Sequence, residues 1–469
     1  MAGEEKDLGT GRTGGREATT GVIPGRVALS VGCPDLEPPK GWKWTMLSSV
    51  AQLESGHTPS RKHPEYWDEG IPWIGIKDAT ENHGRTLSDT YQHVSALGLE
   101  NSSARLLPAN TVCLSRTASV GFVVVMGRPM ATSQDFVNWV CGPNIEAHYL
   151  KYVLLAENEA LWRFASGTTH QTIYYPEAKA FHVCLPPLAE QKAIAAVLGA
   201  LDDKIELNRR MNATLEAMAR ALFQSWFVDF DPVRAKLDGR PPAALDPATA
   251  ALFPASFQES ALGEIPKGWT AGTVVEGFNL TMGQSPPGDT YNEEENGVPF
   301  YQGRTDFGFR FPTRRIYCSA PTRYAKPGDT LVSVRAPVGA INMANEECCI
   351  GRGVAAVRHK SGATSFTYHS MANLYPDFAR FEAEGTVFGS INKDSFEKLR
   401  FVIPPDEIVA AYERQAGPLD EQIRTLENQS RTLATLRDTL LPKLLSGELS
   451  VAEATGNRDF QVQPGMPKP

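Results

Sequence analysis

The stretch LPPLAEQKAIAAVLGALDDKIELNRRMN, residues Leu185–Asn212, carries the strongest structural signal in the sequence. Its two prolines end the preceding segment, because proline fixes φ and cannot donate to a strand ladder. From Glu190 to Phe227 the chain then has no proline and only one glycine, Gly199. Apolar residues recur there in steps of three and four, which predicts one long amphipathic helix. At about 1.5 Å per residue, this helix would be a rod of roughly 57 Å.

The same pattern occurs again near the end of the sequence. The segment IPPDEI at Ile403 repeats the proline pair, and a second helical run begins at Glu407. Aligning the two proline pairs also aligns the apolar stripes of the two runs, so we predict that they pair as an antiparallel coiled coil. Two separate amphipathic surface helices are the alternative. The predicted seam residues are Leu201, Ile205, Leu215, Leu222, Leu419, Ile423, Leu433 and Leu440.

The segments before each helix also repeat. PKGW at Pro39–Trp42 returns at Pro266–Trp269, and SRTASVG at Ser115–Gly121 returns as SVRAPVG at Ser333–Gly339. Each copy starts with short β-type runs separated by turn residues and continues with helical stretches. The sequence therefore predicts a mixed α/β fold with two tandem α/β heads, separated by two long helices and related by a pseudo-twofold axis.

This reading gives seven segments along the chain. They are a disordered leader over residues 1–38, a first head over 39–187, a first long helix over 188–228, an inter-repeat linker over 229–263, a second head over 264–405, a second long helix over 406–447 and a tail over 448–469. The linker is rich in proline and alanine, which predicts semi-rigid polyproline character.

Length and composition narrow the possible functions. The 469 residues are 42% hydrophobic and 21% charged, with a net charge of −8, which is typical of globular protein. That charge excludes a protein that holds nucleic acid by bulk charge alone, but it permits a local basic face. No apolar run approaches the roughly 20 residues of a membrane helix. The N-terminus lacks the apolar core of a secretory signal, so we expect a cytoplasmic protein.

Motifs for catalysis are missing from the sequence. There is no Gly-rich phosphate loop with its lysine. The segment Ser285-Pro286-Pro287 approaches the loop with which adenine methyltransferases grip a flipped base, but Gly288 follows where an aromatic residue is needed. Carboxylates and histidines show no metal-ligand spacing. We therefore predict a non-catalytic recognition or assembly subunit that holds no metal.

Residues 39–447 resemble the DNA-specificity subunit of Type I restriction–modification systems. The resemblance rests on the repeated head and helix, on SGHTPSRKHPEYWDEGIPWIGIKD at Ser55–Asp78, on ATSQDF at Ala131–Phe136 and on LRDTLLPKLLSGEL ending at Leu449. These motifs are specific when they occur together in this order. The second head departs from them, because CIGRGVAAVR at Cys349–Arg358 replaces ATSQDF.

The resemblance implies a function and a set of partners. Each head would be a target-recognition domain that reads one half of a bipartite, asymmetric site in double-stranded DNA. The helices would set the spacer and dock two methyltransferase (modification) subunits, and restriction subunits would join them. S-adenosylmethionine, ATP and Mg would belong to those partners, which methylate adenine N6 and cut DNA. This chain would hold no cofactor and would not itself be an enzyme.

Candidate DNA-binding residues lie in polar loops between apolar runs. Residues 302–358 carry nine Lys or Arg and four acidic residues, which gives the second head a basic segment. Arg and Lys neutralise phosphates, and Arg, Gln and Asn read base edges. The candidates are Lys77, Arg116, Gln134, His170 and Gln171 in the first head and Gln302, Arg304, Arg335, Arg352, Ser390 and Asn392 in the second. Each could instead be a solvated loop residue or could cap its own turn.

Two other functions remain open at this point. The chain could be a coiled-coil scaffold whose heads bind protein or RNA, or an enzyme with a degenerate motif. A salt-dependent duplex affinity that varies with DNA sequence distinguishes the first reading from a scaffold.

Overall fold

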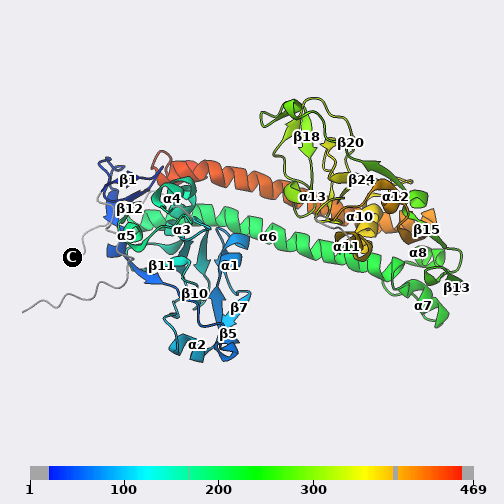
Figure 1. The fold of residues 1–469 in the computed structure, drawn as a ribbon, viewed down its shortest axis with the longest axis horizontal. Helices are drawn as coiled ribbons and strands as arrows, with labels where there is room; N and C mark the ends of the chain where they lie inside the picture. The colour runs from blue at the N-terminus through cyan, green and yellow to red at the C-terminus, as the bar shows by residue number, and fades with distance from the viewer. Residues whose placement is uncertain (1–20, 168–169, 384–388, 457–469) are drawn as a thin grey trace, which may run out of the picture. The chain divides into compact units, whose positions relative to one another are not determined.

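The computed structural model describes residues 21–167, 170–383 and 389–456. The chain divides into two compact units, the first made of Met1–Ile205 with Thr432–Pro469 and the second of Glu206–Arg431. Each unit contains one mixed α/β head. Two helices of 40 residues each, α6 (Leu188–Phe227) and α13 (Asp406–Leu445), contribute to both units (Figure 1). The two long helices of the prediction are therefore present.

The first head is built on three sheets. The central sheet has the order β4-β11-β8-β9-β6, a second has the order β1-β2-β12-β3, and a third has the order β10-β5-β7. The strands are β1 (Ile23–Pro24), β2 (Leu29–Val31), β3 (Lys43–Met46), β4 (Ala51–Ser55), β5 (Trp67–Ile74), β6 (Thr86–Leu87), β7 (Gln92–Val94), β8 (Thr111–Ser115), β9 (Val123–Met126), β10 (Ala131–Thr132), β11 (Phe136–Cys141) and β12 (Phe181–Leu185). The helices are η1 (Leu47–Ser49), η2 (Pro64–Tyr66), α1 (Ile76–Glu81), α2 (Ala96–Glu100), α3 (Ala147–Ala156), α4 (Asn158–Phe164) and α5 (Tyr175–Lys179).

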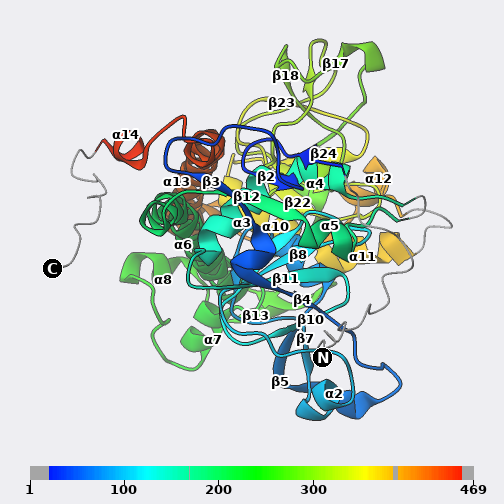
Figure 2. The same ribbon diagram turned by 90° about the vertical axis from the view of Figure 1, so that its left-hand side faces the viewer.

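The central sheet of the first head is covered on both faces. Every residue of β8 and β9 is buried, as expected for a strand with apolar residues on both sides. Helix α3 packs against these two strands (Figure 2). The core of this unit also includes residues of both long helices, among them Ile194 and Leu198 of α6 and Leu444 of α13.

The expectation of a disordered leader over residues 1–38 is wrong for residues 21–38, and residues 1–20 lie outside the described ranges. Strand β2 is fully buried and pairs with β12, about 150 residues further along the chain. The fully buried Glu157 carboxylate accepts backbone N–H bonds from Arg26, Val27 and Ala28. A partner this distant in sequence leaves no local pattern, so the ordering of this segment was not visible in the sequence.

The second head repeats the mixed α/β design. Its sheets have the orders β16-β24-β21-β22, β17-β19-β18-β23-β20 and β15-β25. The strands are β15 (Thr270–Thr273), β16 (Phe278–Met282), β17 (Tyr291–Asn292), β18 (Val298–Tyr301), β19 (Tyr317–Cys318), β20 (Tyr324–Ala325), β21 (Thr330–Ser333), β22 (Ile341–Met343), β23 (Cys348–Ile350), β24 (Val354–His359) and β25 (Arg400–Ile403). The helices are α9 (Val274–Gly277), η3 (Gly288–Thr290), η4 (Arg304–Asp306), α10 (Thr364–Asn373), α11 (Tyr375–Ala383) and α12 (Lys393–Glu397).

The internal repeat extends to individual hydrogen bonds. In the first head, the Ser115 hydroxyl accepts the N–H of Phe122. In the second, the Ser333 hydroxyl accepts the N–H of Ala340, and both of these residues stand at the matching positions of the repeat. Gly121 in the first loop has φ +98°, and its counterpart in the second has φ +88°, which a residue with a Cβ rarely adopts. The two heads therefore share a backbone frame as well as a sequence pattern.

Helices α6 and α13 pack together in an antiparallel sense. Within the second unit, Asn208 Nδ2 donates to Gln429 Oε1 at 2.9 Å, and the Tyr412 hydroxyl donates to the carbonyl of Ala219 at 3.1 Å. The later residue of α6 therefore contacts the earlier residue of α13, as in an antiparallel pair. Of the predicted seam residues, Ile423 is fully buried. The other seven are half-buried, namely Leu201, Ile205, Leu215, Leu222, Leu419, Leu433 and Leu440.

The linker differs from the prediction, and the tail begins with a short helix. Residues 229–263 do not form a polyproline segment but contain α7 (Asp231–Leu237), α8 (Pro247–Leu252) and β13 (Phe257–Ser260), which pairs with β14 (Gly263–Pro266). Both helices have proline in their first turn, where its missing N–H costs nothing. In the tail, α14 covers Val451–Thr455, and residues 457–469 lie outside the described ranges. None of the described helices is long and apolar enough to cross a membrane.

Candidate nucleic-acid interface

A cluster of polar side chains forms in the first head where the loop after β4 crosses the segment before β11. His57 N–H donates to the carbonyl of Thr132 at 2.9 Å, and a Cβ on Gly56 would lie 2.0 Å from the carbonyl oxygen of Ser133. This close approach requires glycine and brings the Thr58 hydroxyl into hydrogen bonding with the side chain of Gln134. Gln134 is exposed, so it is presented to solvent on a tightly held backbone.

Arg116 joins this cluster from the end of β8. Its Nε donates to the backbone carbonyl of Gln134 at 3.2 Å, and its guanidinium carbon lies 4.8 Å from the ring centroid of Tyr175. Burial raises the pKa of Tyr175, although Arg116 opposes that shift, so the phenol stays protonated and can donate. The structure thus brings together two predicted residues, Arg116 and Gln134, with Thr58 and Tyr175, which the sequence interpretation missed.

The second head contains an equivalent crossing, where the loop after β16 meets the segment before β24, but the side chains differ. Gly283 N–H donates to the carbonyl of Val354 at 2.9 Å, and the Ser285 hydroxyl accepts the N–H of Arg352 at 3.4 Å. Ser285 matches Thr58 when the two PKGW motifs are aligned, and Arg352 matches Gln134 when SRTASVG is aligned with SVRAPVG. One frame therefore presents glutamine in the first head and arginine in the second. A glutamine side chain both donates and accepts hydrogen bonds, whereas an arginine side chain only donates them, so the two crossings offer different groups to a ligand.

A second loop pair lies beside this crossing in each head. Ala118 N–H donates to the carbonyl of Gln171 in the first head, and Ala336 N–H donates to the carbonyl of Gly389 in the second, both at 3.0 Å. Arg335 and Ser390 face each other in an isolated β-bridge. The predicted residues His170, Gln171, Arg335 and Ser390 are exposed here. This loop pair therefore extends the polar surface around each crossing.

Three arginines of the second head are available to bind a ligand. Within the described residues, Arg304, Arg335 and Arg352 are exposed and have no carboxylate within ion-pair distance. By contrast, Arg314 pairs with Glu346 and Arg358 pairs with Asp329. A guanidinium without a carboxylate partner can bind phosphate or a base edge without first breaking an ion pair. These three predicted arginines are therefore the strongest anion-binding candidates in this head.

The remaining predicted residues are Lys77, Gln302 and Asn392, and they differ in how free their side chains are to bind a ligand. The Lys77 ammonium on α1 lies 3.9 Å from the Tyr91 ring centroid and 4.0 Å from Glu81 Oε1, so it is already partly compensated. Gln302 is exposed and lies beside Gly351, next to Arg352. Asn392 caps α12 by accepting the N–H of Ser395, which is a structural role.

An exposed arginine next to the first crossing was not among the predicted residues. The Arg61 guanidinium carbon lies 3.6 Å above the ring of Trp67, and its Nη2 donates to Gln92 Oε1 at 2.8 Å. The residue lies within the quoted segment Ser55–Asp78, but nothing in its spacing marked it as different from its neighbours. The stacking keeps this cation at a fixed place on the surface of the first head.

Comparisons with known proteins agree with this arrangement of two heads. A family model described as the Type I restriction modification DNA specificity domain matches residues 39–217 and again residues 266–433. The MjaIX specificity subunit of a Type I restriction enzyme from Methanocaldococcus jannaschii is 25% identical over 433 residues, covering 88% of this chain and 95% of that protein. The HindI specificity subunit from Haemophilus influenzae is 26% identical over 390 residues, covering 69% of this chain and 84% of that protein. The S subunit structure from M. genitalium has a TM-score of 0.55 at 16% identity, covering 88% of this chain and 98% of that one.

Proposed function

The chain belongs to the family of Type I restriction–modification DNA specificity subunits, and on that basis we propose that its two heads read the two halves of a split DNA site. The observation that carries this proposal is the repeated crossing, which presents Gln134 in one head and Arg352 in the other on equivalent backbone. A shared frame with different side chains is what reading two different half-sites by one mechanism requires.

The proposed readers divide into two groups by chemistry. Gln134 and Arg352 lie at the crossings and would contact base edges, because each side chain can form paired hydrogen bonds to a purine. Arg116, Arg304 and Arg335 surround them and would bind phosphates, which position the head without choosing the sequence. Replacing a base-reading side chain should then change specificity at one position, whereas replacing a phosphate contact should weaken all binding equally.

The chain acts with DNA and with other subunits of the restriction–modification system, and we propose that modification subunits dock on α6. Leu207, Met211 and Met218 are exposed on α6, and their spacings of four and seven residues place them on one face of the helix. Exposed apolar residues aligned on one helix face are typical of a protein interface. Two modification subunits with S-adenosylmethionine, and restriction subunits with ATP and Mg, would complete the proposed assembly.

Mapping N6-methyladenine across the genome of the host, with and without the gene, tests the proposed function. We expect methylation to disappear at one split motif when the gene is deleted. The purified chain should also bind duplexes carrying that motif more tightly than scrambled duplexes, by a ratio of at least about a thousand. A genome whose methylation does not change, together with a chain that binds all duplexes equally, would contradict the proposal.

A further inference from the structure

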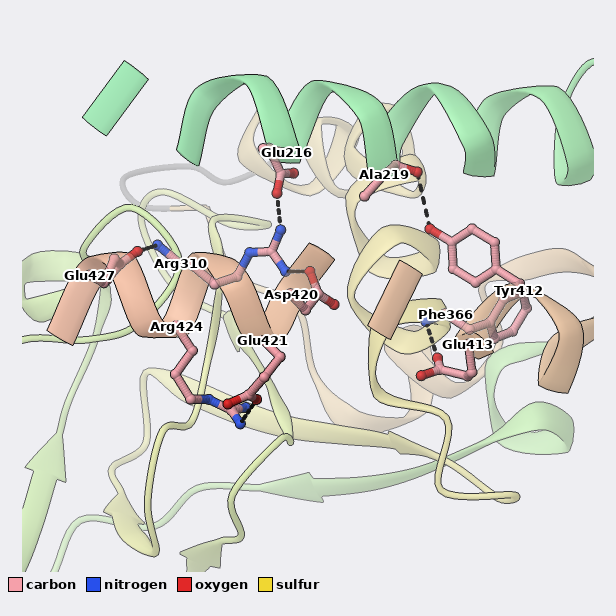
Figure 3. Close-up of polar contacts among 10 residues, drawn as sticks. All are labelled: Glu216, Ala219, Arg310, Phe366, Tyr412, Glu413, Asp420, Glu421, Arg424 and Glu427. Atoms are coloured by element: carbon pink, nitrogen blue, oxygen red, sulfur yellow. Dashed lines mark hydrogen bonds and ion pairs between the residues drawn. The ribbon is translucent and has the colours of Figure 1, made fainter. Parts of the chain in front are cut away.

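One arginine of the second head contacts both long helices. Arg310 is fully buried and lies between η4 and β19. Its guanidinium donates to Asp420 Oδ1 on α13 at 2.5 Å and, through the other terminal nitrogen, to Glu216 on α6 (Figure 3). Its backbone N–H also donates to Glu427 Oε1 at 2.9 Å. A planar guanidinium can bridge two carboxylates in this way, whereas an ammonium is a single point charge.

The residues after Arg310 strengthen this attachment. Phe311 is fully buried in a cluster with Ile423 of α13, and Leu215 of α6 packs against that cluster. Arg431 Nη2 donates to the carbonyls of Phe311 and Pro312 at 3.3 and 3.1 Å. Residues 310–312, hereafter the wedge, therefore bind both helices through charged, apolar and backbone contacts.

The first unit attaches to its helices at the equivalent carboxylate but uses a different cation. Asp202 of α6 matches Asp420 of α13 when the two proline pairs are aligned. Lys151 Nζ of α3 lies 3.1 Å from Asp202 Oδ2, and Arg437 Nη1 of α13 lies 2.8 Å from Asp202 Oδ1. Burial acts to raise the pKa of Asp202, but Lys151 and its other partners outweigh it and lower the pKa. One helix aspartate thus receives a cation from the head in both units.

The second head has no lysine at the position that serves this purpose in the first. In the same alignment the residue that matches Lys151 is His369, and burial lowers its pKa to about 4, so the ring is neutral near pH 7. Within the described residues, neither ring nitrogen of His369 has a hydrogen-bond partner. A neutral imidazole cannot neutralise Asp420, and the wedge supplies the missing cation from another part of the head.

Short hydrogen-bonded links connect the wedge to Arg304, one of the proposed phosphate-binding residues. Phe307 N–H donates to the carbonyl of Arg304 at 3.0 Å, and Thr313 N–H donates to the carbonyl of Asp306 at 2.8 Å. Met343 N–H of β22 donates to the carbonyl of Arg310 at 2.9 Å, which ties the wedge to the β16-β24-β21-β22 sheet of the head. A displacement of the wedge would therefore move Gln302–Arg304 relative to the helices.

We propose that Arg310 is a positioning residue for the second half-site. It holds the loop Gln302–Arg304 at a fixed place on the helix pair and thereby fixes the spacer length at which the second half-site is read. This inference rests on the proposed function. Arg310 itself contacts no DNA, because it is fully buried.

The test compares three variants of the full chain in its native host. Arg310→Lys keeps the charge but can reach only one carboxylate at a time. Glu216→Gln removes the ionic contact with α6 alone, and its side chain is partly exposed, so the fold should tolerate the change. Arg314→Gln is the matched control, because this exposed arginine of the same head pairs with Glu346 and not with a helix.

The readout is genome-wide N6-methyladenine at the wild-type motif and at motifs whose spacer is one base pair longer or shorter. We expect Arg310→Lys and Glu216→Gln to reduce the preference for the native spacer by roughly tenfold to a hundredfold, since a misplacement of about 1 Å can cost a hundredfold. Arg314→Gln should keep the wild-type preference. Discrimination at the half-site of the first head should be unchanged in all three variants.

Other outcomes distinguish a failure of the proposed role of Arg310 from a failure of the proposed function of the chain. An unchanged spacer preference in both test variants would overturn the role of Arg310. An equal loss at both half-sites would also overturn it, because that result indicates general destabilisation. A wild-type chain that directs methylation to no split motif would count against the proposed function itself.

Discussion

Replacing Ile423 with aspartate should open the helix seam of the second unit. Ile423 is fully buried beside Phe311, Met343 and Tyr368. Losing this burial costs about 1.5–3 kcal/mol. The introduced carboxyl would be buried three residues from Asp420, and the neighbouring Arg310 already donates to Asp420 and Glu216. A buried charge that competes for an occupied cation adds several kcal/mol. The total approaches the roughly 5–15 kcal/mol by which a typical protein is stable.

The pH dependence of this variant has a definite sign. Burial raises the pKa of a carboxyl in the folded state above its unfolded value of about 3.9. The full penalty is therefore present near pH 7 and shrinks as the pH falls towards that value. Ile423→Asn is the matched reference, because it has the same shape and no titrating group. We expect the two variants to differ in stability at pH 7 and to converge by about pH 4.

Urea unfolding at several pH values gives the free energies, and hydrogen exchange locates the loss. Exchange should accelerate in α13 around position 423 and in the wedge, both in the second unit. Leu419→Asp is a second control, since Leu419 is only half-buried and its carboxylate could reach water. Equal free energies of unfolding for Ile423→Asp and Ile423→Asn at pH 7 would refute the reasoning, because water would then reach the side chain at position 423.

Three further predictions concern other parts of the molecule. Arg352→Gln should change the free energy of unfolding by no more than about 0.5 kcal/mol. It should reduce discrimination at one base of one half-site by about 1–3 kcal/mol, which duplex titration measures. An equal loss of affinity for all duplexes would indicate a phosphate contact instead. Met211→Glu should reduce co-purification of the modification subunit, whereas Ala213→Glu, on another face of α6, should not. Asp202→Asn should destabilise the first unit most near pH 7 and less in acid, because the lowered pKa of Asp202 makes its contribution disappear as the pH falls.

The sequence predicted the large-scale design because that design is repeated. Two matching proline pairs marked the start of both long helices, and α6 and α13 begin at Leu188 and Asp406. The linker was misread because its prolines suggested an extended chain. Pro232 and Pro247 instead stand in the first turns of α7 and α8, and Asp246 caps the second of these helices.

The candidate interface was only partly predictable. Arg116 and Gln134 could be chosen because they stand in polar loops, but the contact of Gln134 with Thr58 depends on a crossing between segments 76 residues apart. Arg310 could not be distinguished from the other arginines of its basic segment. Local charge counts treat a buried bridge and a free surface arginine alike, and only tertiary packing separates them.

The duplication also suggests how the two heads could diverge without losing their attachment. Asp202 and Asp420 occupy equivalent places on the two helices, yet their cations come from α3 in one head and from the wedge in the other. Asp420 is buried and Asp202 is half-buried, and a carboxylate shielded from water is costly when it has no cation partner. The cation, however, can come from any nearby segment. A head could therefore exchange its loops and its DNA sequence preference while the helix aspartate kept the attachment point, provided that the new loops again supplied a cation to it.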